Sequence, residues 1–257
     1  MAEPFDFTGR VVVVTGGTKG VGRGIAARFM DAGAKVIVTA RNEPDQPLER
    51  GGHTAGFVAA DVRDPEQADR VIAFALTEHG RVDTLVNNAG GGPPADAASA
   101  SPRFSEAIIR LNLIAPLVLA QSANAVMQQQ PEGGSIINIC SVSGTRPSPG
   151  SAAYGASKAG LLNLTQSLAI EWAPRVRVNA VTPGYIETEQ SHLHYGDEAG
   201  VAAVAAIIPL RRMGTPDDVG LACLFLASPL SSYISGSNLA VHGGGERPPF
   251  LAASNAD

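Results

Sequence analysis

The sequence predicts a single α/β domain, built as a doubly wound parallel sheet of about seven strands with helices on both faces. Four β-branched residues at 11–14 are followed at once by glycines and then by apolar residues at helical spacing. Short apolar runs and helical patterns go on alternating along the chain, which is typical of parallel strands joined by right-handed crossovers. With 257 residues and no repeat or linker, the chain is expected to form one domain over 1–257.

Composition and charge exclude several classes of function. The net charge is −5 and no basic tract is present, so a nucleic-acid partner is not expected. No apolar run reaches about 18 residues and residues 1–10 lack an apolar core, so neither a membrane span nor a signal peptide is expected. The two cysteines, Cys140 and Cys223, fall in apolar patterns and are interpreted as inert buried thiols, which fits a cytoplasmic protein.

The first strand, 10–15, runs directly into a glycine-rich turn. Its glycines, Gly16, Gly20 and Gly22, have the spacing G-x-x-x-G-x-G, and a helical pattern follows as far as Gly33. A strand, a glycine turn and a helix in this order direct backbone N–H groups and a helix N-terminus toward a phosphate. A glycine-rich turn alone is often only a tight turn, but in this context it favours a nucleotide site.

The second strand, 35–39, ends at a basic residue where an NAD site would have an acidic one. A carboxylate about twenty residues after the glycines accepts from the ribose 2′-hydroxyl of NAD. This sequence has Arg41 there, and Lys19 lies inside the glycine turn. Two cations without an acid fit a 2′-phosphate, so we predict NADP(H). The alternatives are that both are surface charges, with Glu43 as a partner for Arg41, and that the cofactor is NAD(H).

The middle of the chain continues the alternation of elements. The expected order is a polar surface loop (42–56), a strand (57–60), a helix from Pro65, a strand (83–86), a loop (91–102) and a helix (103–129). Asp61 follows the third strand, where its carboxylate can accept from an adenine amino group. Asn87 and Asn88 follow the fourth strand. Their side chains are expected to form hydrogen bonds with neighbouring backbone groups and to line the adenosine side of the site. Asn112 and Pro116 predict a kink in the long helix, since proline leaves the carbonyl of Asn112 unpaired.

The stretch from Cys140 to Lys158 carries the groups with the most specific chemistry. Tyr154 and Lys158 are four apart on a predicted helix (152–172), so they project from one face, and Ser141 follows the strand 135–139. Lowering a phenol pKa from about 10 to about 7 takes roughly 4 kcal/mol, and an ammonium about 4 Å away supplies that order of energy. Tyr154 is therefore a candidate general acid and base. Alternatively, this common spacing pairs a half-buried tyrosine with a solvated lysine.

The last third of the chain supplies a sixth strand, a lid and a final helix and strand. The strand 175–181 leads into Thr182–Thr188, and 185–210 is interpreted as a variable lid over the site. Its histidines, His192 and His194, lack metal-ligand spacing, so no metal site is expected. A helix near 216–227 and a strand near 238–241 complete the pattern, and 246–257 is interpreted as a terminal extension.

These residues together resemble the short-chain dehydrogenase/reductase family, of the ~250-residue single-domain type. The resemblance covers roughly Thr8 to Gly245. It is carried by six features in order: the turn Thr15–Gly22, Asp61, Asn87–Gly90, Asn112, Ser141 with Tyr154–Lys158, and Pro183-Gly184. The departures are small: Cys140 stands where serine is common, and the tail beyond Gly245 is long.

The resemblance implies a Rossmann fold, a catalytic tetrad of Asn112, Ser141, Tyr154 and Lys158, and NADP(H) as cofactor. Lys158 would also hold the nicotinamide ribose, while Ile186 and Thr188 would meet the carboxamide. It further implies a homotetramer, or a dimer, paired through the helix that carries Tyr154. The full set of expected cofactor-binding residues is Gly16, Thr18, Lys19, Gly20, Val21, Gly22, Arg41, Asp61, Val62, Asn88, Ala89, Gly90, Tyr154, Lys158, Pro183, Gly184, Ile186 and Thr188.

The function expected from the sequence is hydride transfer between NADP(H) and a ketone or secondary alcohol. The competing hypotheses are a cofactor-sensing regulatory protein, which typically loses the tyrosine or the lysine, and epimerisation or dehydration, which usually belong to longer chains. The substrate stays open among an apolar ketone, a 3-oxoacyl thioester, a steroid and a sugar.

Overall fold

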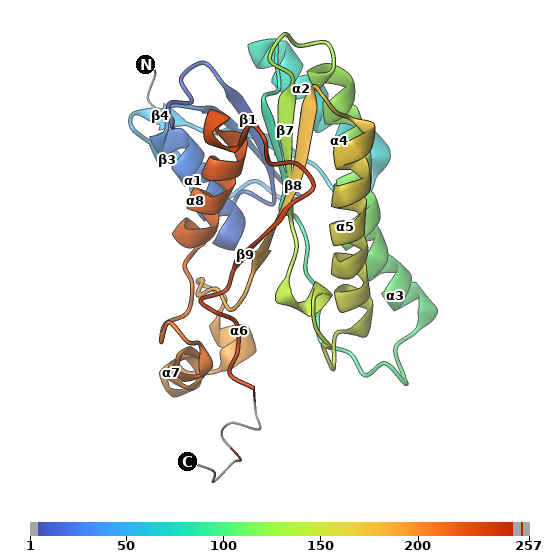
Figure 1. Cartoon of the computed structure of the whole chain (residues 1–257), viewed down its shortest axis with the longest axis vertical. Helices are drawn as coiled ribbons and strands as arrows, with labels where there is room; N and C mark the ends of the chain where they lie inside the picture. Colours follow the sequence, from blue (N-terminus) through green and yellow to red (C-terminus); the bar gives the residue numbers. More distant parts are fainter. Residues whose placement is uncertain (1–4, 249–252, 254–257) are drawn as a thin grey trace.

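A seven-stranded, fully parallel sheet forms the centre of the molecule (Figure 1). The structure, a computed structural model, describes residues 5–248 and 253. The strand order is β5-β2-β1-β6-β7-β8-β9, so the direction of winding reverses between β1 and β6. The strands are β1 (Val11–Thr15), β2 (Lys35–Ala40), β5 (Gly56–Ala59), β6 (Thr84–Asn87), β7 (Gly134–Ile139), β8 (Val176–Pro183) and β9 (Asn238–Val241). This confirms the predicted fold class.

Helices cover both faces of the sheet because alternate residues of each strand point to opposite sides. In β1, Val12 and Val14 pack with α1 (Gly20–Asp31) and α8 (Pro216–Ala227). Val11 and Val13 face the other way and pack with α2 (Pro65–His79) and α4 (Ala115–Met127). The helix α5 (Ala152–Glu171) lies beside α4 on that second face (Figure 1). All four valines are buried, as a strand covered on both sides requires.

The polar loop at 42–56 contains a short hairpin that the sequence interpretation missed. Its strands are β3 (Glu49–Arg50) and β4 (His53–Thr54), paired antiparallel. Gly51 and Gly52 form the two-residue turn, with φ values of 56° and 78°. A Gly-Gly turn is a recognised hairpin signal, but the four flanking residues are all exposed and have no apolar alternation to reveal a strand.

The long helix expected over 103–129 is divided into three pieces. It begins as α3 (Pro102–Ile109), widens into one π-helical turn at Arg110–Ile114, and continues as α4. The wide turn falls at the predicted kink, around the fully buried Asn112. The Asn112 amide donates to Ile108 O at 2.9 Å, so its side chain competes for the helix backbone, as expected for asparagine.

The helical stretch 102–127 is the one described helix long and apolar enough to be compared with a membrane span. By length and composition it is apolar enough to cross a membrane, although no single apolar run suggested this. Here its α4 part lies on the sheet, where Leu119 and Ala123 are buried against strand residues.

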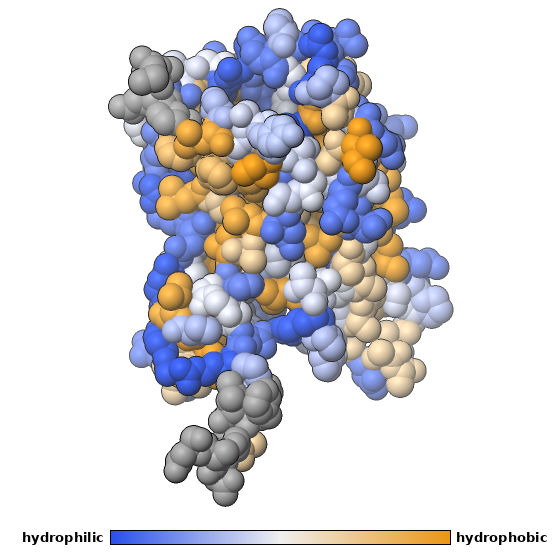
Figure 2. Space-filling view, in the orientation of Figure 1, coloured by the Kyte–Doolittle hydropathy of each residue, from blue (hydrophilic) through white to orange (hydrophobic). Residues whose placement is uncertain are grey.

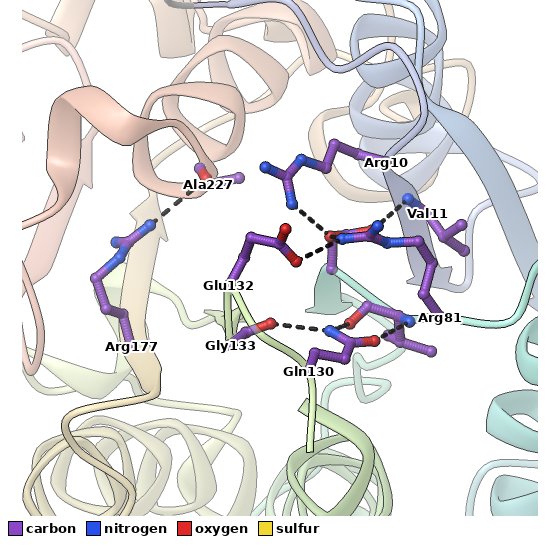
Figure 3. Close-up of polar contacts among 10 residues, drawn as sticks. Arg10, Val11, Arg81, Gln130, Glu132, Gly133, Arg177 and Ala227 are labelled. Carbon is purple, nitrogen blue, oxygen red and sulfur yellow. Dashed lines mark hydrogen bonds and ion pairs between the residues drawn. The ribbon is translucent and has the colours of Figure 1, made fainter. Parts of the chain in front are cut away.

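The amino edge of the sheet is held by a buried carboxylate that bonds two arginines (Figure 3). Asp83, which precedes β6, is 7% exposed and accepts from Val11 N at 2.8 Å. Arg10 Nη1 donates to it at 2.9 Å, and Arg81 donates through Nε at 2.8 Å and Nη2 at 2.6 Å. Arg81 also reaches Glu132 at 3.2 Å (Figure 3). Asp83 thus joins β1 to β6 beyond the backbone ladder.

Replacing Asp83 with alanine is expected to lower the free energy of unfolding by about 2–4 kcal/mol, because the buried Val11 N–H and two guanidinium groups lose their acceptor. Chemical denaturation measures the loss. Glu132→Ala is the matched control: its carboxylate is half exposed, so about 1 kcal/mol or less is expected. Equal losses for the two variants would contradict the role of Asp83.

The lid region contains two helices rather than irregular chain. These are α6 (His192–Tyr195) and α7 (Glu198–Ile207), which lie beyond the carboxyl edge of the sheet (Figure 1). The alanine-rich sequence of α7 has little amphipathic pattern, because its apolar residues lie on all sides of the helix. None of these residues is fully buried. The final helix and strand, α8 and β9, have the predicted bounds.

Apolar side chains also reach the surface. Figure 2 shows hydrophobic areas between hydrophilic ones across the viewed face. Among described residues, the large apolar side chains that are more than half exposed are Ile170, Leu193, Leu210, Leu221, Leu230 and Tyr233. Scattered exposure of this kind is normal for a single chain, and it leaves surface available for association with further copies.

Candidate active site

A cavity of about 560 Å³ lies at the carboxyl edge of the sheet, where the winding reverses between β1 and β6. Ligands of doubly wound sheets bind at this kind of position. Every residue predicted from the sequence as catalytic or cofactor-binding lines this cavity, except Asn112. Residues up to 172 positions apart in the sequence, from Gly16 to Thr188, therefore meet around one space.

The glycine turn forms a close-fitting end of the cavity. A Cβ on Gly22 would lie 2.2 Å from Gly16 O, so only glycine allows the helix to start this near the strand. Asn88 braces the turn, because its Nδ2 donates to Thr15 O at 2.8 Å and to Gly16 O at 3.3 Å. The first helical hydrogen bond of α1 runs from Arg23 N to Lys19 O, so earlier N–H groups lack intrahelical acceptors; that of Gly20 is bonded to Glu189, and those of Val21 and Gly22 remain to face a phosphate. This is a phosphate-binding geometry.

Three basic residues surround the end of the cavity near β2 and β5. Lys19 and Arg41 are the two predicted cations, and Arg63 is a third that the sequence interpretation did not include. Arg63 forms a bidentate contact with Asp61, through Nε at 2.9 Å and Nη2 at 2.5 Å. The Arg63 guanidinium holds the pKa of the Asp61 carboxyl below its usual range. Asp61 lines the cavity as predicted, but its carboxylate already has a partner.

Tyr154, Lys158 and Ser141 meet at the other end of the cavity. Lys158 is 3% exposed, and its Nζ donates to Ile139 O at 2.8 Å and lies 5.7 Å from the centroid of the Tyr154 ring. Asn112 lies just behind them: a Cβ on Gly90 would be 2.7 Å from Asn112 Oδ1 and 3.3 Å from Lys158 Nζ. Asn112 also bonds Gly91 twice, accepting from its N–H and donating to its carbonyl, both at 2.8 Å. Asn112 thus positions the segment that separates it from Lys158.

The sequence analysis predicted a lowered pKa for the Tyr154 phenol, and the structure gives a raised one. Burial raises the pKa of the Tyr154 phenol above its ordinary value, and the Ser141 hydroxyl beside it opposes the rise. Burial also lowers the pKa of Lys158 to about 8. The sequence argument placed an ammonium about 4 Å from the phenol but left out the desolvation of both groups, which disfavours their charged forms. The two side chains do face one cavity, as predicted.

The buried thiol of Cys140 follows directly after β7, near Lys158. It is 3% exposed and lines the cavity next to Ser141. Burial raises the pKa of the Cys140 thiol to about 12, and the nearby Lys158 partly opposes this. Cys140 is therefore a thiol and not a thiolate near neutral pH, in agreement with its interpretation as inert.

Residues of the lid form one side of the cavity. Gln190, His194 and Tyr195 line it together with Thr188. The Tyr195 ring meets the Tyr185 ring edge to face, with centroids 6.0 Å apart.

Arg146 continues this contact toward the C-terminus. It donates to Tyr185 Oη at 3.3 Å and forms an ion pair with Glu246. Glu246, the first residue of the predicted terminal extension 246–257, therefore contacts the body of the domain through Arg146. The rest of the tail lies largely outside the described residues.

A second cavity of about 380 Å³ shares Tyr154 with the first. It lies between the loop 92–100, helix α3 and the start of α5, and Pro93, Phe104, Ile108 and Ile109 are among its walls. Its walls are mostly apolar. An apolar group of a ligand that reacts at Tyr154 can be buried there without loss of polar contacts.

The first cavity fits a nicotinamide dinucleotide. It is long enough to join a phosphate-binding turn and a cationic end to a proton-exchanging end, and the close approach at Gly22 leaves room for phosphates at the helix N-terminus. Lys19, Arg41 and Arg63 would lie near the adenosine ribose, while Lys158, Ile186 and Thr188 would lie near the nicotinamide. These are the residues that the sequence resemblance implies, with Arg63 added.

Comparison with known proteins agrees with this geometry. A family profile described as enoyl-(acyl carrier protein) reductase matches residues 16–246. The chain is 37% identical over 250 residues to 3beta-hydroxysteroid dehydrogenase 1 of Eggerthella lenta, covering 93% of this chain and 94% of that one. It is 37% identical over 239 residues to a 3-oxoacyl-[acyl-carrier-protein] reductase of Vibrio cholerae, covering 92% and 97%.

A solved structure is also similar over the full length. The ligand-free aldohexose dehydrogenase of Thermoplasma acidophilum has a TM-score of 0.87 and 32% sequence identity, and 99% of each chain is covered. The names of these relatives describe oxidoreductases for a steroid, an acyl thioester and a sugar. The shared fold therefore accompanies three different substrate classes.

Proposed function

This chain belongs to the short-chain dehydrogenase/reductase family and is an oxidoreductase for alcohols and ketones, and we propose that it uses NADP(H) and an apolar ketone or secondary alcohol. The observation that carries the proposal is the single cavity that joins Lys19 and Arg41 to Tyr154 and Lys158. The cations favour a 2′-phosphate at one end, and the phenol exchanges a proton at the other.

The side chains at the reacting end divide the work. The bound nicotinamide supplies or accepts the hydride, which no side chain of this protein can do. The Tyr154 phenol gives its proton to the substrate oxygen during reduction and takes it back during oxidation. The Ser141 hydroxyl orients that oxygen beside Tyr154. Lys158, when charged, stabilises the phenolate form, and Asn112 positions the Gly90-Gly91 backbone next to it.

The preference for NADP(H) over NAD(H) rests on charge. Arg41 and Lys19 line the cavity without a carboxylate partner among the described residues, whereas Arg63 and Asp61 form an ion pair whose charges offset each other. A phosphate between cations forms charge-assisted hydrogen bonds, each worth about 1.5–3 kcal/mol. A ribose hydroxyl at the same place gains much less.

Replacing Arg41 with alanine is expected to weaken NADPH binding by about 10- to 100-fold, the equivalent of one charge-assisted hydrogen bond, and to change NADH binding by less than about 2-fold. Fluorescence titration with both dinucleotides measures this. Arg70→Ala, at an exposed arginine on α2 outside the cavity, is the control and should change neither affinity. Equal weakening of NADPH and NADH by Arg41→Ala would refute the 2′-phosphate role.

An apolar substrate is favoured by the second cavity, whose walls include Phe104, Ile108 and Ile109 and which reaches Tyr154. The substrate class among ketones is tested by a carbonyl panel read at the absorbance of NADPH. Apolar cyclic, aromatic and long-chain ketones, including a 3-oxoacyl thioester, should react with higher kcat/KM than sugars. A higher kcat/KM for aldoses than for apolar ketones would contradict the proposal of an apolar substrate.

A regulatory protein that senses the cofactor is the alternative from another class. The presence of both Tyr154 and Lys158 in one cavity favours the enzyme. Tight NADP(H) binding with no turnover across the panel would favour the sensor. The cytoplasmic location and the homotetramer stay predictions, and sedimentation analysis of the purified protein tests the second.

A further inference from the structure

One hydrogen bond connects the lid to the glycine turn across the mouth of the cavity. Gly20 N, in the first turn of α1, donates to Glu189 Oε1 at 2.9 Å. The two residues are 169 positions apart in the sequence and lie on opposite rims of the cavity. The contact uses an N–H group that lacks an intrahelical acceptor, and it places a negative charge at the positive end of a helix.

Glu189 lies at the rim and not inside the cavity. Its neighbours Thr188 and Gln190 both line the cavity, whereas the Glu189 side chain is exposed and is not part of the lining. A dinucleotide that extends from Arg41 to Tyr154 must pass between the glycine turn and this part of the lid. The Glu189–Gly20 bond therefore links two segments that line the cavity, through a side chain that is not itself part of the lining.

The lid segment around Glu189 is internally fixed, so the bond can hold more than one side chain. Thr188 N donates to Ser191 Oγ at 2.8 Å, and Ser191 N donates to Thr188 O at 3.0 Å. Gln190 N also donates to Thr188 Oγ1 at 3.3 Å. These bonds form a compact turn directly before α6. Fixing Glu189 thus fixes Thr188, which the proposed function places beside the nicotinamide.

We propose that Glu189 is a positioning residue that fastens the lid to the glycine turn over the bound dinucleotide and so slows its release. The inference rests on the proposed function, since it requires a dinucleotide in this cavity. Glu189 touches neither the substrate nor the reacting atoms. The opposite effect is also physically reasonable, because a carboxylate near phosphates repels them and would speed release. The sign of the change on mutation separates the two.

The test measures release of NADPH from the intact protein by stopped-flow displacement, read by nicotinamide fluorescence. Glu189→Ala should release NADPH about 3- to 30-fold faster, the range for one exposed hydrogen bond to a carboxylate. Glu189→Gln keeps an oxygen acceptor of the same reach, so its rate should lie between those of Glu189→Ala and the wild type. The hydride-transfer step, followed in a single turnover, should stay within about 2-fold, since no reacting group is changed.

Glu187→Ala is the matched control. Glu187 is an exposed glutamate two residues away, and within the described chain its carboxylate has no hydrogen bond or ion pair. This variant makes the same charge change and should leave the release rate at the wild-type value. Melting temperatures of all three variants, expected to match the wild type, show that the fold is intact.

The possible failures can be told apart. Wild-type protein that binds no dinucleotide would overturn the proposed function itself. Wild-type binding with unchanged or slower release from Glu189→Ala would overturn only the role of Glu189. Faster release from Glu187→Ala as well would show a general charge effect, and it would equally refute a specific bond to Gly20.

Discussion

Replacing Tyr154 with phenylalanine is expected to lower kcat by about 10²- to 10⁴-fold, the usual contribution of a positioned acid or base, while dinucleotide affinity changes by less than about 2-fold. The substitution removes only the hydroxyl. The aromatic ring still fills the boundary between the two cavities that Tyr154 shares. Without the phenol, no proton is available at the substrate oxygen when the hydride arrives, so chemistry is slowed and binding is kept.

Steady-state kinetics with an accepted ketone and fluorescence titration with NADPH measure the two quantities separately. Tyr233→Phe is the matched control, because Tyr233 is fully exposed and lies outside both cavities. It removes the same hydroxyl and should leave kcat unchanged. A rate near that of the wild type for Tyr154→Phe would end the assignment of Tyr154 as the acid and base.

Replacing Lys158 with methionine is expected to lower kcat by about 10²-fold or more and at the same time to stabilise the fold at pH 7. Across residues 5–248, no carboxylate lies within ion-pair distance of the buried Lys158 amine, and burial lowers its pKa to about 8. Below pH 8 the folded protein therefore buries a charged amine. Methionine has a similar length and removes this cost, worth about 1–3 kcal/mol after loss of the bond to Ile139 O.

The pH dependence of this stabilisation follows from the sign of the pKa shift. The folded pKa of Lys158, about 8, is below the ordinary lysine value of 10.5. Below pH 8 the amine is charged in both states, so the folded state carries the whole desolvation cost. As pH rises from 8 to 10.5 the folded state loses its proton first and the cost disappears. The advantage of Lys158→Met should thus be largest at pH 7 and shrink toward pH 10.

Denaturant unfolding of wild type and Lys158→Met at several pH values between 7 and 10 measures this difference. Taking the difference between the two proteins cancels the ionisation of the buried cysteines, which both retain. Lys35→Met, at an exposed lysine at the start of β2, is the control and should leave kcat unchanged. A Lys158→Met variant less stable than the wild type at pH 7 would show that the charged amine supports the fold.

The sheet and its helices could be predicted from the sequence because burial on both faces leaves a strong pattern. The run Val11–Val14 is such a case, since each valine meets a helix on one side or the other. The bounds of α8 and β9 were also predicted correctly, although β9 is an edge strand with no buried residue. The hairpin at Glu49–Thr54 was missed because its exposed residues carry no hydrophobic alternation.

The candidate site was predictable where local sequence fixes geometry. Tyr154 and Lys158 share a helix face by spacing alone, and the glycine turn follows directly from its strand. Contacts between distant segments left no such signal. Glu246 pairs with Arg146 and Glu189 accepts from Gly20, and only the folded chain brings these residues together. The desolvation that raises the pKa of Tyr154 likewise depends on packing.

The position of Asp83 has a consequence for how this protein can be altered. Its arginine cluster lies before β6, whereas the cavity residue Asn88 lies just after that strand, so five residue steps of extended chain separate Asp83 from Asn88 by roughly 16 Å. Substitutions at sites this far apart, without shared partners, usually have additive effects. Stability lost when the lid is redesigned for a new ketone could therefore be restored by substitutions around Asp83 at the opposite edge of the sheet. The two sets of changes could be optimised independently and then combined.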